Sequence, residues 1–331
     1  MERAGLSPDL TSRARAGRGR LALRLGLSLG VLATVLFVVG IDGARAGFER
    51  LAPWAFALAL VVFLSLQAVS ALKWRWFVSL AGARLSAGDA VGCHAAGLFA
   101  NLCLPSLIGG DVLRLTLALP RTRAGTRTSL VLGSIVDRVA DLLALATLAL
   151  FGLLASPAAA GRLGGTLVAI PVTLGVMILG GAGAACGLKI LLARRPLRRQ
   201  PRKLIQVLRG LRALRRRPVS ALAAWSSCLA IQGGFVLVNV VVGRSLGLEL
   251  SVGMWFLLWP LAKIAAMLPI SFGGLGVREA AFAALLAPWG LQGLAVAQSL
   301  VWQSVLLVGG LLAGLYWSQA LAAPRTTEAS A

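Results

Sequence analysis

The chain alternates between long apolar runs and short polar segments that are rich in arginine. Several of the runs are about 20 residues long, which is enough to cross a hydrocarbon layer about 30 Å thick. The pattern predicts an all-α polytopic membrane protein with about six full transmembrane helices. The predicted spans lie near 25–41, 53–72, 129–153, 164–188, 219–243 and 293–319.

Two further apolar regions, 90–119 and 252–288, are interrupted by the segments NLCLPSLIGGDVLR and LPISFGGLGVRE. Proline ends or kinks a helix, and glycine is the next worst helix former. Backbone groups freed at membrane depth are tolerated only where protein or a water-filled cavity satisfies them. Each region is therefore predicted to be a broken helical hairpin, re-entrant or of two short helices, that faces a polar interior.

The two interrupting segments also resemble each other. LPSLIGGDVLR at 104–114 aligns without a gap with LPISFGGLGVR at 268–278. Proline and arginine are scarce within the apolar runs, so their coincidence predicts an internal repeat. The matched residues are Pro105 with Pro269, Gly109 and Gly110 with Gly273 and Gly274, and Arg114 with Arg278, and Gly276 adds a further break in the second copy.

Composition and charge agree with a membrane location. Hydrophobic residues make up 58% of the chain and charged residues 13%, which is unlike a pair of soluble domains. The net charge of +22 comes from basic residues that lie mainly between the apolar runs, a bias that marks the cytoplasmic side and needs no nucleic acid partner. We expect a cell-membrane protein with both termini in the cytoplasm. The basic start followed by an apolar run also fits a cleavable signal peptide.

The predicted organisation is a basic tail at 1–24, a single membrane domain at 25–320 and a short tail at 321–331. Repeat one covers about 25–153, and repeat two covers about 164–319 with a basic cytoplasmic loop at 189–217. The flanking charges predict that the first hairpin is entered from the cytoplasm and the second from outside. Inverted repeats of this kind are typical of transporters, whose sites lie near the midplane at the repeat interface.

The broken helices suggest a binding chemistry. If half-helices follow the glycine pairs, their first-turn N–H groups point into the cavity and favour an anion, and Arg114 and Arg278 add bidentate phosphate donors. The structural alternative is that the glycines allow close helix packing and that the arginines pair with Asp111 and Glu279.

Further ionisable residues occur inside the apolar runs. Asp137 and Asp141 share one helical face, and Arg138 is three residues before Asp141 and can reach it. Charges at membrane depth indicate burial in a polar interior, as a proton or cation relay or as a structural ion-pair network. Lys263, before the break at Pro269, either adds positive charge to the same cavity or extends its amine to the membrane surface.

Other candidate residues are less specific. Asn101 precedes the first break, where it caps exposed backbone, binds a headgroup or packs. His94 is the only histidine, so a chain of histidines for proton exchange is excluded. No nucleotide-binding loop or metal-ligand spacing is present in the sequence, so we expect no cofactor, no metal and no catalytic residue. The cysteines are interpreted as small packing residues: Cys93, Cys103, Cys186 and Cys228.

LPISFGGLGVREAAF, NLCLPSLIGGDVLR and VDRVADL together carry a family resemblance. The chain resembles the flippase-like transmembrane domain of the lysylphosphatidylglycerol synthase family over about residues 20–320. In bifunctional members this domain is thought to move aminoacylated phosphatidylglycerol between leaflets, and a separate cytosolic domain makes that lipid. Because few residues follow the last predicted span, we expect no lipid aminoacylation from this chain.

The resemblance implies translocation of a phosphate-bearing membrane lipid, either an anionic or aminoacylated phospholipid or a glycosylated lipid. It also implies a possible lipid-modifying enzyme or glycosyltransferase as partner, and a homo-oligomer is possible. The alternatives are a membrane-embedded transferase or accessory subunit in glycolipid synthesis, and a transporter of a small anion. The family motif positions are Asn101, Pro105, Gly109, Gly110, Asp111, Arg114, Asp137, Arg138, Pro269, Gly273, Gly274, Gly276, Arg278 and Glu279.

Overall fold

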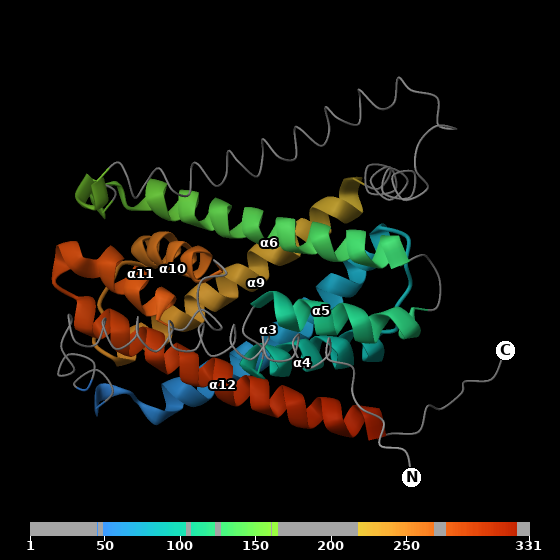
Figure 1. The fold of residues 1–331 in the computed structure, drawn as a ribbon. Coiled ribbons are helices and arrows are strands. Elements are labelled where there is room, and N and C mark those ends of the chain that lie inside the picture. Colours follow the sequence, from blue (N-terminus) through green and yellow to red (C-terminus); the bar gives the residue numbers. More distant parts are fainter. Residues whose placement is uncertain are drawn as a thin grey trace, which may run out of the picture.

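The computed structural model describes residues 45, 49–103, 107–122, 127–159, 161–164, 218–267 and 276–322 (Figure 1). These ranges are helical and contain no β-sheet. The α-helices are α3 (Pro53–Leu80), α4 (Ala87–Cys103), α5 (Leu107–Ala118), α6 (Arg127–Ala155), α9 (Pro218–Ser245), α10 (Val252–Ala266), α11 (Val277–Leu286) and α12 (Gln292–Ala322), with short 3-10 helices η1 (Leu119–Arg121) and η3 (Ala287–Trp289).

Four helices, α3, α6, α9 and α12, are long and apolar enough to cross a membrane. They coincide with four of the predicted spans, so the prediction of an all-helical membrane protein is confirmed for this part of the chain. Helix α3 continues to Leu80, past the predicted end at 72. The predicted span at 25–41, the loop at 189–217 and all but the first residue of the span at 164–188 lie outside the described ranges.

Each interrupted region contains a pair of short helices. The first pair is α4 and α5, with the break between Cys103 and Leu107, and the second is α10 and α11, with the break between Ala266 and Val277. In Figure 1 the α4–α5 hairpin lies towards one end of the long helices α6 and α12, and the α10–α11 hairpin lies towards the other end. Pro105 and Pro269 fall within the breaks, outside the described residues.

Each hairpin packs on the long helix that follows the other hairpin. Helix α6, which follows the first hairpin, packs on α10 of the second, and α12, which follows the second hairpin, packs on α4 of the first. The α6–α10 contact brings the helix backbones together at Gly152, where a Cβ atom would collide with the backbone at Leu257. Helices α3 and α9 cross near their centres, where a Cβ atom on Gly234 would lie 3.1 Å from Cδ1 of Leu66.

Local structure recurs at a constant spacing of 165 residues. Helices α3, α4 and α6 begin at 53, 87 and 127, and α9, α10 and α12 begin at 218, 252 and 292. Gly82 and Gly247 follow α3 and α9 and have left-handed φ values of +96° and +85°. The Ser86 hydroxyl then accepts the backbone N–H of Asp89 at 3.0 Å, and the Ser251 hydroxyl accepts that of Met254 at 3.3 Å. The two halves thus share helix starts, turn and cap.

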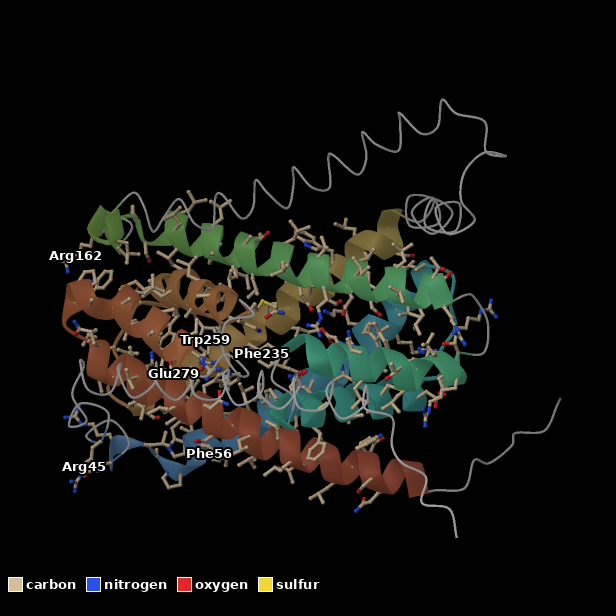
Figure 2. The ribbon with its side chains drawn as sticks, in the orientation of Figure 1. Arg45, Phe56, Arg162, Phe235, Trp259 and Glu279 are labelled. Atoms are coloured by element: carbon tan, nitrogen blue, oxygen red, sulfur yellow. The ribbon has the colours of Figure 1, made fainter. Side chains whose placement is uncertain are left out.

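The apolar core is concentrated around the second hairpin, where buried aromatic rings from α3, α9, α10, α11 and α12 contact one another. Phe235 and Trp259 are two of these residues and are labelled in Figure 2. The ring centroids lie 5.4 to 6.3 Å apart, a spacing at which aromatic pairs attract each other. The rings are Phe63, Phe235, Trp255, Trp259, Phe282 and Trp302.

Candidate functional site

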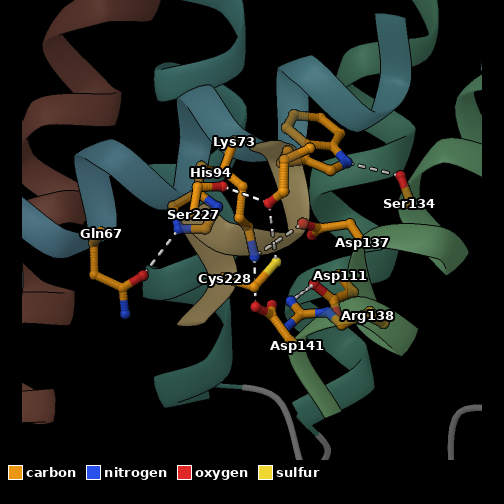
Figure 3. A network of polar contacts seen from close by, with 12 residues as sticks. Gln67, Lys73, His94, Asp111, Ser134, Asp137, Arg138, Asp141, Ser227 and Cys228 are labelled. Atoms are coloured by element: carbon orange, nitrogen blue, oxygen red, sulfur yellow. Dashed lines mark hydrogen bonds and ion pairs between the residues drawn. The ribbon is translucent and has the colours of Figure 1, made fainter. Parts of the chain in front are cut away.

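A lysine on α3 is the centre of a buried ionic cluster in the first half (Figure 3). Lys73 Nζ lies 3.0 Å from Oδ1 of Asp137 and 2.5 Å from Oδ1 of Asp141, and all three side chains are at most 10% exposed. The two aspartates are one turn apart on α6, as their spacing predicts, so a single ammonium reaches both. The thiol of Cys228 on α9 lies beside the same ammonium.

The second pair in this cluster joins α6 to the first hairpin. Arg138 donates to Oδ1 of Asp111 on α5, although its spacing also allows it to reach Asp141. Asp141 is instead paired with Lys73. The Arg138 side chain is 41% exposed, which makes it the most accessible cation of the cluster.

Arg114 joins the same cluster from α5. Its Nη2 atom lies 3.3 Å from Oδ1 of Asp111 and 3.9 Å from Oδ2 of Asp137, and its guanidinium carbon lies 4.4 Å from the ring centre of Trp74. The Trp74 indole N–H in turn donates to the Ser134 hydroxyl at 2.8 Å. Three cations therefore face three carboxylates. The cluster members are Lys73, Arg114, Arg138, Asp111, Asp137 and Asp141.

The only histidine links this cluster to the centre of α3. His94 Nδ1 lies 3.2 Å from Nη1 of Arg114, and its Nε2 lies 3.0 Å from Oε1 of Gln67. A guanidinium can only donate, so Nδ1 is the acceptor and Nε2 carries the proton that is donated to Gln67. The contacts therefore assign a neutral imidazole with a defined tautomer.

The glycine pair of the first hairpin has a packing role. Helix α5 begins at Leu107, so Gly109 and Gly110 lie in its first turn and do not precede it. The half-helix thus starts before the pair, and the condition for free first-turn N–H groups directly after the glycines is not met. The Gly110 N–H donates to Oδ1 of Asn101 at 3.1 Å, and a Cβ atom on Gly110 would collide with Asn101 and with the carbonyl of Gly97. Atoms of α4 thus contact the first turn of α5, where an anion was expected to bind.

The second hairpin has its own buried ion pair. Arg278 Nη2 lies 3.0 Å from Oε1 of Glu279, 3.2 Å from the carbonyl oxygen of Ser299 and 2.8 Å from Oε1 of Gln303. Glu279 Oε2 accepts the N–H of Gly276 at 2.7 Å, and Gly276 has a φ of +82°, a value that favours glycine. Glu279 thus fixes the start of α11 and neutralises the arginine. Gly273 and Gly274 lie outside the described residues.

Both arginines predicted to hold a lipid phosphate are engaged by the protein. Arg114 is 3% exposed and Arg278 is 5% exposed. Each keeps one buried donor, Nε, that finds no hydrogen-bond partner among the residues the structure describes. Their main contacts correspond to the structural alternative, pairing with Asp111 and Glu279.

Lys263 lies in the last turn of α10 and is half-buried. Its Nζ atom donates to Oε1 of Gln232 at 2.6 Å and lies 4.7 Å from the ring centre of Phe235. It is also within electrostatic range of Asp141 in the first half and of Arg278 in the second. No carboxylate pairs with it in the described part of the chain, so it is a cation between two neutralised clusters.

Sequence reasoning missed several polar residues. Lys73 lies just past 72, where the second predicted span ends, so its burial within α3 was not expected. The two glutamines that bind His94 and Lys263 are 165 residues apart, one more than the 164 of the aligned motifs, so extending the repeat alignment with a one-residue gap would have paired them. The same extension pairs Trp74 with Asn239, which accepts from Gln298 at 2.9 Å. The missed residues are Gln67, Lys73, Gln232, Asn239, Gln298 and Gln303.

Comparison with known proteins is consistent with this architecture. Within the described ranges, no three His, Cys, Asp or Glu side chains are grouped so that they could hold a metal ion. The chain matches no curated protein and no solved structure. A family model described as lysylphosphatidylglycerol synthase TM region matches residues 21–314. The match covers most of the sequence, and the chain therefore belongs to this family of integral membrane proteins.

Proposed function

We propose that this chain is a translocase that moves a phosphate-bearing lipid between membrane leaflets. The observation that carries the proposal is the cluster of six charged side chains between α3, α5 and α6. A charge at membrane depth costs about 2.5–3.5 kcal/mol on insertion scales, and apolar residues of similar volume often stabilise a core better than buried ion pairs do. Stability alone therefore does not account for the cluster, whereas a polar route for a headgroup does.

The matched halves support a transport mechanism. Helix starts, left-handed glycines and serine caps recur after 165 residues, and each hairpin packs on the helix that follows the other. We infer an inverted repeat, in which the same unit is inserted from opposite faces of the membrane, with both termini on the cytoplasmic side. Such repeats allow the access route to alternate around a central site.

Cysteine labelling tests the inverted arrangement. Arg84 and Glu249 are exposed and lie 165 residues apart, each just before its hairpin. In a background without native cysteines, Arg84→Cys should react with an impermeant maleimide from the cytoplasmic face and Glu249→Cys from the other. Labelling of both from the same face would contradict the inverted repeat.

Family membership supports a lipid as cargo, because the matching region is that of a protein named for a phospholipid. The purified protein should be placed in liposomes with a fluorescent phosphatidylglycerol, and the lipid in the outer leaflet bleached with dithionite. We expect faster exchange than in protein-free vesicles. Arg138→Gln should slow it, because this cation is accessible, whereas Leu154→Ala on the lipid-facing surface should not. Exchange no faster than in empty vesicles would exclude a lipid translocase.

A further inference from the structure

The charges inside the bundle do not cancel. The first cluster contains three cations and three carboxylates, and α11 contributes one of each, Arg278 and Glu279. Lys263 is the remaining cation, and its hydrogen-bond acceptor is the neutral amide of Gln232. The predicted spans 25–41 and 164–188 and the two segments at the hairpin breaks contain no Asp, Glu, Lys or Arg. Among the interior residues that the structure describes, one positive charge is therefore in excess.

The position of this excess charge suits a ligand that reaches the centre of the bundle. Gln232 lies at the middle of α9, two residues before Gly234, where α9 crosses α3. Lys263 is half-buried and not sealed in the core. The ammonium has two further N–H donors beyond the one given to Gln232. A phosphate oxygen at this point would receive a charge-assisted hydrogen bond without displacing an existing ion pair.

We propose that Lys263 binds a singly charged phosphate group and that the chain therefore selects lipids with a net negative headgroup over aminoacylated lipids. This inference rests on the proposed translocase function and specifies its substrate class. An aminoacylated headgroup brings additional ammonium groups, which need unpaired carboxylates. The described carboxylates of the interior, Asp111, Asp137, Asp141 and Glu279, are all paired with cations of the protein.

The test compares two acyl-labelled lipids in the same proteoliposomes, phosphatidylglycerol and lysylphosphatidylglycerol. We expect the anionic lipid to exchange at least about tenfold faster, the difference associated with one hydrogen bond to a charged group. Equal exchange, or faster exchange of the lysyl lipid, overturns the inference but leaves the translocase function intact. If neither lipid exchanges faster than in protein-free vesicles, the translocase function itself fails.

Substitutions at Lys263 assign the selectivity to this residue. Lys263→Gln should lower the phosphatidylglycerol rate about tenfold and bring the two rates together, and Lys263→Arg should preserve the preference. A Lys263→Gln variant that elutes as folded protein and keeps the wild-type preference would overturn the assignment. The wild-type comparison remains decisive if the variant does not fold.

A free phosphate ion has the same chemistry as a lipid phosphate, so its uptake is measured in parallel. Uptake of radiolabelled inorganic phosphate should not exceed that of protein-free vesicles. Saturable phosphate uptake that is lost in Lys263→Gln, without lipid exchange, would assign the site to a soluble anion and overturn the lipid substrate.

Discussion

The two hairpins each contribute a buried arginine, but the protein holds the two arginines in different ways. Arg114 is the eighth residue of α5, and its carboxylates come from α5 and α6. Arg278 is the second residue of α11, and its carboxylate is the next residue in the chain. The first arginine therefore depends on how helices are placed relative to one another, whereas the second is neutralised locally.

This difference indicates a division of roles. The first cluster joins α3, α5 and α6, so any relative movement of these helices changes its ion pairs. The Arg278–Glu279 pair lies against the aromatic core and fixes the start of α11 against α12. The first half thus holds its ion pairs between helices, whereas the second holds a local ion pair and most of the buried aromatic rings.

The largest effect is expected from Lys73→Met. This change leaves Asp137 and Asp141 buried without their shared cation, which should cost about 5 kcal/mol. The melting temperature in detergent, followed by size-exclusion chromatography, should fall steeply. The double variant Lys73→Met/Asp141→Leu should recover much of the melting temperature that is lost in Lys73→Met. Leu72→Ala, at a neighbouring exposed position, serves as the control. A single variant as stable as wild type would show that the first cluster is not a stabilising ionic unit.

Glu279→Gln should cost about 3 kcal/mol, less than Lys73→Met, because Arg278 keeps Gln303 and the Ser299 carbonyl as acceptors. The same melting assay applies. Arg278→Met/Glu279→Gln removes both charges and should be more stable than the single variant. If the double variant is the less stable, Arg278 is not neutralised mainly by its neighbour.

Gly110→Ala should destabilise the first hairpin by about 2 kcal/mol, because its Cβ meets the carbonyl of Gly97 and the side chain of Asn101. Gly92→Ala on α4 is the matched control, since nothing lies within 4 Å of its Cβ position. The control should be neutral or slightly stabilising, because alanine is the better helix former. Equal melting temperatures for the two variants would contradict the close α4–α5 packing.

The smallest effects concern the matched glutamines. Gln67→Leu should cost about 1 kcal/mol, because it removes the acceptor of a neutral His94 N–H. Gln232→Leu should cost somewhat more, because its partner Lys263 is charged. Ser65→Ala, which removes only a hydrogen bond to the carbonyl of Val61 in the same helix, is the control. A larger loss of stability for Gln67→Leu than for Gln232→Leu would contradict the expected order of the two hydrogen bonds.

Hydrophobic patterning was sufficient to predict the long helices and the two hairpins. Spans of about 20 apolar residues have few alternatives in a membrane, so α3, α6, α9 and α12 were expected where they occur. The alignment of the two broken segments also indicated that Arg114 and Arg278 are related. The carboxylates Asp111 and Glu279 were correctly considered as their partners, as one of two alternatives.

Partners between helices could not be predicted from spacing along the chain. Spacing allowed Arg138 to reach Asp141, one turn away, but its hydrogen-bond partner is Asp111 on α5. Lys73 lies next to Trp74 and Arg75, a composition typical of a membrane boundary, and only the packing of α6 against α3 shows that it is buried. A helical pattern that continues through Phe77 and Leu80 was the available signal.

The crossing of α3 and α9 has a mechanical consequence. Leu66 lies near the centre of α3, with thirteen residues before it and fourteen after it. At 1.5 Å per residue, each arm is about 20 Å long. A rigid rotation about this point moves the two ends of the helix by similar distances in opposite directions. In the proposed translocase, such a rotation would open one face of the bundle while it closes the other.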